Sequence, residues 1–182
     1  MGGGNMKNYI QTLKEKYGKF FGMVYCAGVA NIMPTKSLDY KSMRADFDIN
    51  YFIPILMIKE IAKRANNANK DTSIVIISAL SSIMPLNGML AYSGAKAALN
   101  ASCKAISKEY SNVGVRINTI LPSDINTPMS ENMAFFVKNR THLYPFGFGN
   151  PNDVAHMAIF LLSNKSAFIS GQNYIVDSGE MS

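Results

Sequence analysis

The sequence predicts an α/β domain built around a parallel β-sheet, because short apolar runs alternate with longer stretches of helical character. The short runs are rich in β-branched residues and end in small or polar residues, which is typical of buried parallel strands. The longer stretches supply a helix between successive strands. The predicted strands span residues 20–25, 73–78, 115–121 and 173–176.

The first part of the chain predicts a helix, a strand and a pair of helical stretches. Residues 8–17 have apolar residues at helical spacing, and Gly18 is suited to end that helix. Residues 38–64 follow the first strand and predict two helical stretches that meet at residues 46–50. The polar residues 66–71 then predict a loop that leads to the second strand.

The second part of the chain continues this alternation. Residues 91–111 combine small and apolar side chains, and they predict a long helix that can pack closely against its neighbours. The third strand ends at Pro122 and enters a polar loop. A further helix begins at Pro151, a residue favoured in the first helical turn, and precedes the last strand.

Length and composition predict one soluble domain that spans residues 1–182. The chain is 48% hydrophobic, which is enough for one sizeable core. No apolar stretch approaches the ~18 residues that cross a bilayer, and no secretory leader is apparent, so we expect a cytoplasmic protein without a membrane partner. Cys26 and Cys103 make no disulfide framework, which agrees with that compartment.

The basic charge does not by itself indicate a nucleic-acid partner. The net charge is +6, from 18 Lys and Arg against 12 Asp and Glu. These residues are scattered, and no basic run is interleaved with aromatic residues, so a solvated surface is the better interpretation. His142 and His156 lack the spacing of metal ligands, and we therefore expect no metal site.

Tyr92 and Lys96 are the most informative pair of residues in the chain. They lie four residues apart near the start of the predicted helix 91–111, so both side chains are on one helical face. A nearby cation favours the phenolate, so we expect the Tyr92 pKa to lie below its usual value of ~10. Such a tyrosine can exchange a proton near neutral pH.

The order of motifs from residue 8 onward resembles the short-chain dehydrogenase/reductase family. A strand ends at Ser78, a YxxxK pair follows at Tyr92 and Lys96, and the next strand leads into an NxxxP-S-x-I-x-T segment. The chain closes with the segment GQNYIVDSG. The resemblance implies a Rossmann-like, doubly wound parallel sheet. It also implies an oxidoreductase that transfers a hydride between NAD or NADP and a small carbonyl compound or secondary alcohol, for example a 3-oxoacyl compound or a sugar-related ketone.

The same resemblance implies roles for individual residues. Tyr92 would act as general acid and base, Lys96 would lower its pKa and hold the ribose, and Asn50 would support a proton relay. A buried, helix-capping Asn50 explains the sequence equally well. Residues 129–140 would form a lid over the substrate. The residues that would contact the dinucleotide are Cys26, Ala27, Gly28, Tyr92, Lys96, Pro122, Ile125 and Thr127.

The chain departs from the family pattern at the catalytic serine. Ala79 occupies the position that usually carries this serine. Ser78, Ser81 and Ser82 are the candidates to replace it. If the chain stays extended here, Ser81 lies on the same side as residue 79, and we therefore expect Ser81 to contact the substrate.

A second departure concerns the sheet. The family's first two βα units, which include the Gly-rich turn for the pyrophosphate, are not in the sequence, so we expect an N-terminally truncated sheet. This leaves an alternative hypothesis, a catalytically silent fragment that acts as an oligomerisation or binding module. In the family, the helices that correspond to residues 53–64 and 91–111 pair across a dimer, so a homo-oligomer is implied under either hypothesis.

Overall fold

The computed structural model describes residues 3–68, 72–131 and 140–181, and these contain a four-stranded parallel sheet. Its strands are β1 (Gly22–Tyr25), β2 (Thr72–Ile77), β3 (Val115–Pro122) and β4 (Asn173–Val176), and they are adjacent in this order. Each strand is parallel to its neighbour. The prediction of an α/β fold around a parallel sheet is confirmed.

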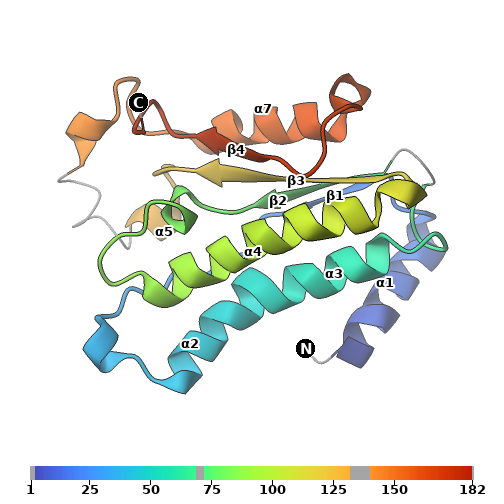
Figure 1. Cartoon of the computed structure of the whole chain (residues 1–182), viewed down its shortest axis with the longest axis horizontal. Helices are drawn as coiled ribbons and strands as arrows, with labels where there is room; N and C mark the ends of the chain where they lie inside the picture. Colours follow the sequence, from blue (N-terminus) through green and yellow to red (C-terminus); the bar gives the residue numbers. More distant parts are fainter. Residues whose placement is uncertain (1–2, 69–71, 132–139, 182) are drawn as a thin grey trace.

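Helices cover both faces of the sheet (Figure 1). α1 (Gly3–Tyr17), α3 (Ile53–Ile61) and α4 (Leu90–Glu109) lie on one face, whereas α7 (Pro151–Leu162) lies on the other. Each successive strand is added at the same edge of the growing sheet, but the connecting helices α4 and α7 lie on opposite faces of it. The β3–α7–β4 crossover therefore has the opposite hand to the β2–α4–β3 crossover.

The two layers of helices explain why β2 is buried along almost its whole length and is apolar from Ile74 to Ile77. Ile74 and Ile76 belong to the core cluster beneath α3 and α4, which also contains Leu99. Val75 points to the other face and packs with Leu161 of α7. A parallel strand that is covered on both faces has no solvent-facing positions to fill with polar residues.

The predicted junction between two helical stretches is a continuous helix with a local widening. α2 (Tyr40–Phe47) begins after Asp39, whose carboxylate accepts a hydrogen bond from the backbone N–H of Ser42. A π-helical turn, Asp48–Phe52, then connects α2 directly to α3. Such turns are frequent at functional sites. This one buries Asn50 completely.

Other differences from the prediction concern the ends of elements and the lid. α1 begins at Gly3, five residues earlier than expected, and β1 begins at Gly22. Of the lid expected over residues 129–140, residues 132–139 lie outside the described part of the chain, and the residues just before them form α5 (Pro128–Glu131). Within the described residues, no helix combines the length and the apolar character that a membrane span requires.

Two leucines of α4 should differ greatly in their contribution to stability. Leu99→Ala leaves a cavity among fully buried neighbours and should lower the free energy of unfolding by about 2–5 kcal/mol. Leu90→Ala is the matched control, because that side chain is 50% exposed and should change stability by less than ~0.5 kcal/mol. Urea unfolding followed by circular dichroism measures both values. Equal effects would contradict the assignment of Leu99 to the core.

Candidate active site

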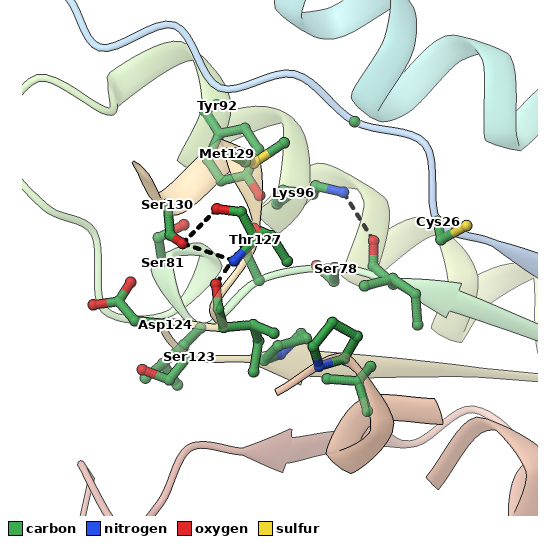
Figure 2. Close-up of a pocket in the computed structure, with 18 of the residues that line it drawn as sticks. Cys26, Ser78, Ser81, Tyr92, Lys96, Ser123, Asp124, Thr127, Met129 and Ser130 are labelled. Carbon is green, nitrogen blue, oxygen red and sulfur yellow. Dashed lines mark hydrogen bonds between the residues drawn. The ribbon is translucent and has the colours of Figure 1, made fainter. Parts of the chain in front are cut away.

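A pocket of about 670 Å³ lies at the carboxyl ends of β1, β2 and β3 (Figure 2). Parallel strands bring these ends to the same edge of the sheet, which is where ligands bind in open α/β sheets. α4 lines the pocket through Tyr92 and Lys96. α7 lines it through apolar side chains that include Val154 and Ile159. The pocket therefore combines a mostly apolar wall with a few polar groups, as small-molecule sites do.

Tyr92 and Lys96 come together in this pocket. They lie one helical turn apart on α4 and are almost fully buried, with 8% and 3% of their surface exposed. Lys96 Nζ lies 5.7 Å from the centroid of the Tyr92 ring. It also donates a hydrogen bond of 2.8 Å to the carbonyl oxygen of Ile77, at the end of β2 (Figure 2). This contact fixes the position of the ammonium group beneath the tyrosine.

Burial dominates the electrostatics of the pair. It raises the pKa of Tyr92 to about 12, and the charge of Asp46 adds to this effect. Burial also lowers the pKa of Lys96 to about 8. The pKa shift of Tyr92 is opposite to the one expected from the sequence, because loss of hydration disfavours the phenolate and the charge of Asp46 repels it. At neutral pH, Tyr92 therefore holds its proton.

Asn50 lies behind the pocket and is not part of its lining. Its Nδ2 donates hydrogen bonds to the carbonyl oxygens of Val29 (2.8 Å) and Asp46 (3.0 Å). Its Oδ1 is buried and has no hydrogen-bond partner among the described residues. A Cβ added at Gly28 would lie 3.0 Å from this oxygen and 3.7 Å from Lys96 Nζ. The Asn50 oxygen and the Lys96 ammonium group therefore both lie next to Gly28.

The segment after β2 is not extended, as the expectation for Ser81 assumed, although Ser81 itself lines the pocket. Leu80–Ser82 form a 3₁₀ turn, so side chains do not alternate as in an extended strand. The Ser82 hydroxyl donates to the carbonyl oxygen of Ala79 and does not line the pocket. Ser78 and Ser81 both line the pocket, and their buried hydroxyls have no hydrogen-bond partner in the described part of the chain. Geometry thus leaves both serines available to a ligand.

Most of the residues expected to contact a dinucleotide line the pocket. They come from the end of β1, from α4 and from the loop after β3. Those in the lining are Cys26, Gly28, Tyr92, Lys96, Pro122, Ile125 and Thr127, whereas Ala27 is not in it. Thr127 is held in place by a bond from its backbone N–H to Ser130 Oγ (3.0 Å, Figure 2). Because Gly28 has no side chain, a ligand can approach Asn50 and Lys96 closely there.

The structure adds a charged cluster that the sequence did not indicate. Arg140 forms an ion pair with Glu180, and its Nε lies 4.0 Å from Asp124 Oδ2. The Tyr144 hydroxyl donates a 2.5 Å hydrogen bond to the same Asp124 oxygen, and Ser123 donates to Glu180. All except Tyr144 line the pocket. No local motif connects these residues, since they lie on separate segments of the chain.

Comparison with known proteins places this geometry in a family. The profile described as enoyl-(acyl carrier protein) reductase matches residues 3–180. The chain is 37% identical over 124 residues to a 2,5-dichloro-2,5-cyclohexadiene-1,4-diol dehydrogenase of Sphingobium indicum, a match that covers 67% of this chain and 48% of the relative. It is 29% identical over 180 residues to a 2-keto-3-deoxy-L-fuconate dehydrogenase of Xanthomonas campestris, covering 93% of this chain and 60% of that protein.

The chain thus matches about half the length of the first of these relatives and somewhat more of the second. A solved structure, a short-chain type dehydrogenase/reductase from Mycobacterium ulcerans, is similar over nearly the whole chain. The TM-score is 0.90 at 27% sequence identity, and the similarity covers 99% of this chain and 67% of that structure. The protein belongs to the short-chain dehydrogenase/reductase family.

Proposed function

We propose that the protein is an oxidoreductase that transfers a hydride between NAD or NADP and a small carbonyl compound or secondary alcohol. The observation that carries the proposal is the buried Tyr92 and Lys96 pair at the carboxyl ends of the strands. A proton donor is required there, because the oxygen of a carbonyl group takes up a proton when the carbon receives a hydride. A bound nicotinamide dinucleotide supplies the hydride in reduction and accepts it in oxidation.

In this proposal each residue of the site has a defined task. Tyr92, which is protonated at neutral pH, donates its proton to the carbonyl oxygen and recovers it in the reverse direction. Lys96 stabilises the phenolate that remains and binds the ribose. Asn50 supports the path by which the proton is replaced. Ser81, or Ser78, donates a hydrogen bond to the substrate oxygen in place of the serine that Ala79 replaces.

A second candidate function is a catalytically silent module for binding or oligomerisation. Two observations favour it. Ala79 removes the usual serine hydroxyl, and one face of α4 exposes a row of small residues that could contact another subunit closely: Gly94, Ala97, Ala101 and Ala105. A homo-oligomer is part of our proposal in either case, as are a single domain and a cytoplasmic location without nucleic-acid or membrane partners.

The first experiment is a titration of the purified chain with NADH and with NADPH. If the proposal is correct, we expect saturable binding by fluorescence and a higher thermal midpoint, since a ligand that binds only the folded state stabilises it. The matched variant is Gly28→Ala, whose methyl group would lie 3.0 Å from Asn50 Oδ1 and should weaken binding. A folded chain that binds neither nucleotide would favour the silent module.

Replacement of the proposed proton donor tests the chemistry directly. Tyr92→Phe should lower kcat by at least ~10²-fold with a carbonyl substrate, because the general acid is lost while the ring and its packing remain. Dinucleotide binding should persist, which separates catalysis from binding. Tyr110→Phe, at the other end of α4, is the control and should leave kcat unchanged. If Tyr92→Phe turned over substrate at the wild-type rate, the assignment of Tyr92 as proton donor would be refuted.

Lys96 should reduce stability while it serves the reaction. Its pKa is about 8 in the folded chain and near 10.5 when unfolded, so below pH 8 the ammonium is charged in both states and the folded state bears the desolvation cost. Lys96→Met should therefore raise the free energy of unfolding at pH 7 by about 1–3 kcal/mol, after allowing for the lost bond to Ile77.

The gain from Lys96→Met should shrink between pH 8 and pH 10, because there the folded wild type has released the proton that the unfolded chain still holds. Turnover should fall in the same variant. Lys104→Met, an exposed position on the same helix, is the control and should change stability little at any pH. Denaturant unfolding at several pH values measures the effect. A destabilised Lys96→Met at pH 7 would show that the hydrogen bond to Ile77 outweighs the cost of burying the ammonium.

A further inference from the structure

We propose that Arg140, Asp124 and Glu180 select the substrate, and that they select a neutral molecule with hydroxyl groups on adjacent carbons, the chemistry of a polyol or sugar. The inference rests on the proposed function, because it names the substrate class of the same pocket. It makes these three residues specificity determinants and assigns them no part in proton or hydride transfer.

The guanidinium group of Arg140 supplies unused hydrogen-bond donors. Its side chain is 16% exposed and lines the pocket. Nη2 pairs with Glu180, whereas Nε and Nη1 are buried and have no hydrogen-bond partner among the described residues. Buried donors without partners are costly, and in native proteins they are normally met by water or by a ligand. A substrate in the pocket can satisfy them.

Asp124 supplies an acceptor beside these donors. Its Oδ2 accepts a hydrogen bond from the Tyr144 hydroxyl. No hydrogen bond to its other carboxylate oxygen occurs within the described residues. Figure 2 shows Asp124 at the same pocket as Tyr92 and Thr127. A hydroxyl group both donates and accepts, so one hydroxyl can accept from Arg140 while a neighbouring one donates to Asp124. Neither a ketone oxygen nor an alkyl chain can do both.

The charge balance of the cluster disfavours an anionic ligand. One guanidinium faces two carboxylates, and the nearly fully buried Glu180 already pairs with it directly. A carboxylate or phosphate group placed on Arg140 would meet an excess negative charge in a partly desolvated pocket. The two acidic residues thus act against anions of otherwise similar shape, which is a common source of specificity.

The rest of the lining suits the carbon skeleton of such a ligand. Met89, Leu86 and Tyr92 pack together beside the pocket, and Met84 also lines it. A polyol has polar edges and C–H faces. Its hydroxyl groups can therefore contact Arg140 and Asp124 while its C–H faces contact this apolar wall.

The test is a binding experiment on the full chain with two six-carbon polyhydroxy probes, neutral D-glucose and anionic D-gluconate. Calorimetry or ligand-observed NMR, with and without NADH, should show saturable glucose binding that is at least ~10-fold tighter than gluconate binding. Arg140→Met should weaken glucose binding by about 10-fold or more, because charge-assisted hydrogen bonds are lost. Arg44→Met is the matched control, since the Arg44–Asp48 ion pair is exposed on α2 and lies outside the pocket lining.

A second variant guards against misfolding. Arg140→Lys keeps the positive charge beside Glu180 but offers fewer donors, so it should fold like the wild type and bind glucose with an intermediate loss. The proposal is overturned if gluconate binds as tightly as glucose, if both Arg140 variants bind glucose normally, or if folded wild-type chain does not bind glucose. Glucose binding by a chain that binds neither NADH nor NADPH would overturn the oxidoreductase proposal alone, whereas binding of either nucleotide and turnover without glucose binding would overturn only the substrate class.

Discussion

The hydrogen bond from Lys96 to the carbonyl of Ile77 joins α4 to the end of β2, and the geometry of the pocket depends on it. Leu99 anchors the same helix in the core one turn further on. Because the helix is held both by this hydrogen bond and by the packing of Leu99, Tyr92 has little freedom to leave the carboxyl edge of the sheet. The cost is a buried ammonium group that has no carboxylate partner in the described part of the chain, and the apolar core on both faces of the sheet must offset it.

Unpaired polar atoms are concentrated around this pocket. Seven buried side-chain atoms have no hydrogen-bond partner among the described residues. Four of them line the pocket, namely the hydroxyls of Ser78 and Ser81 and two nitrogens of Arg140, and Asn50 Oδ1 lies behind it. The other two, Ser93 Oγ and Asn100 Oδ1, are on α4 outside the lining. Elsewhere, buried polar side chains such as Asn67 and Ser73 bond to backbone carbonyl groups. Native proteins tolerate unsatisfied groups mainly where function requires them, so this distribution itself marks the pocket as a binding site.

Local sequence patterns predicted the structure well where that structure is itself local. Tyr92 and Lys96 share a helical face because their spacing requires it, and β2 is buried because its composition leaves no polar face. The expectation for Ser81 assumed an extended chain, and this assumption was wrong because the chain turns at residues 80–82. The pKa direction of Tyr92 could not be obtained from spacing either, since it depends on how much water the surrounding elements exclude.

The sequence by itself determined the order of strands and helices, the family and the residues that lie within one helical turn of each other. Tertiary structure alone decided which distant groups meet. Arg140 and Glu180 are 40 residues apart, and Asp124 comes from a third segment. Contacts of this kind form only when separate loops converge at one edge of the sheet, so neither periodicity nor composition carries a signal for them. The same holds for burial, which sets the charge of Tyr92 and Lys96 and is a property of the assembled layers.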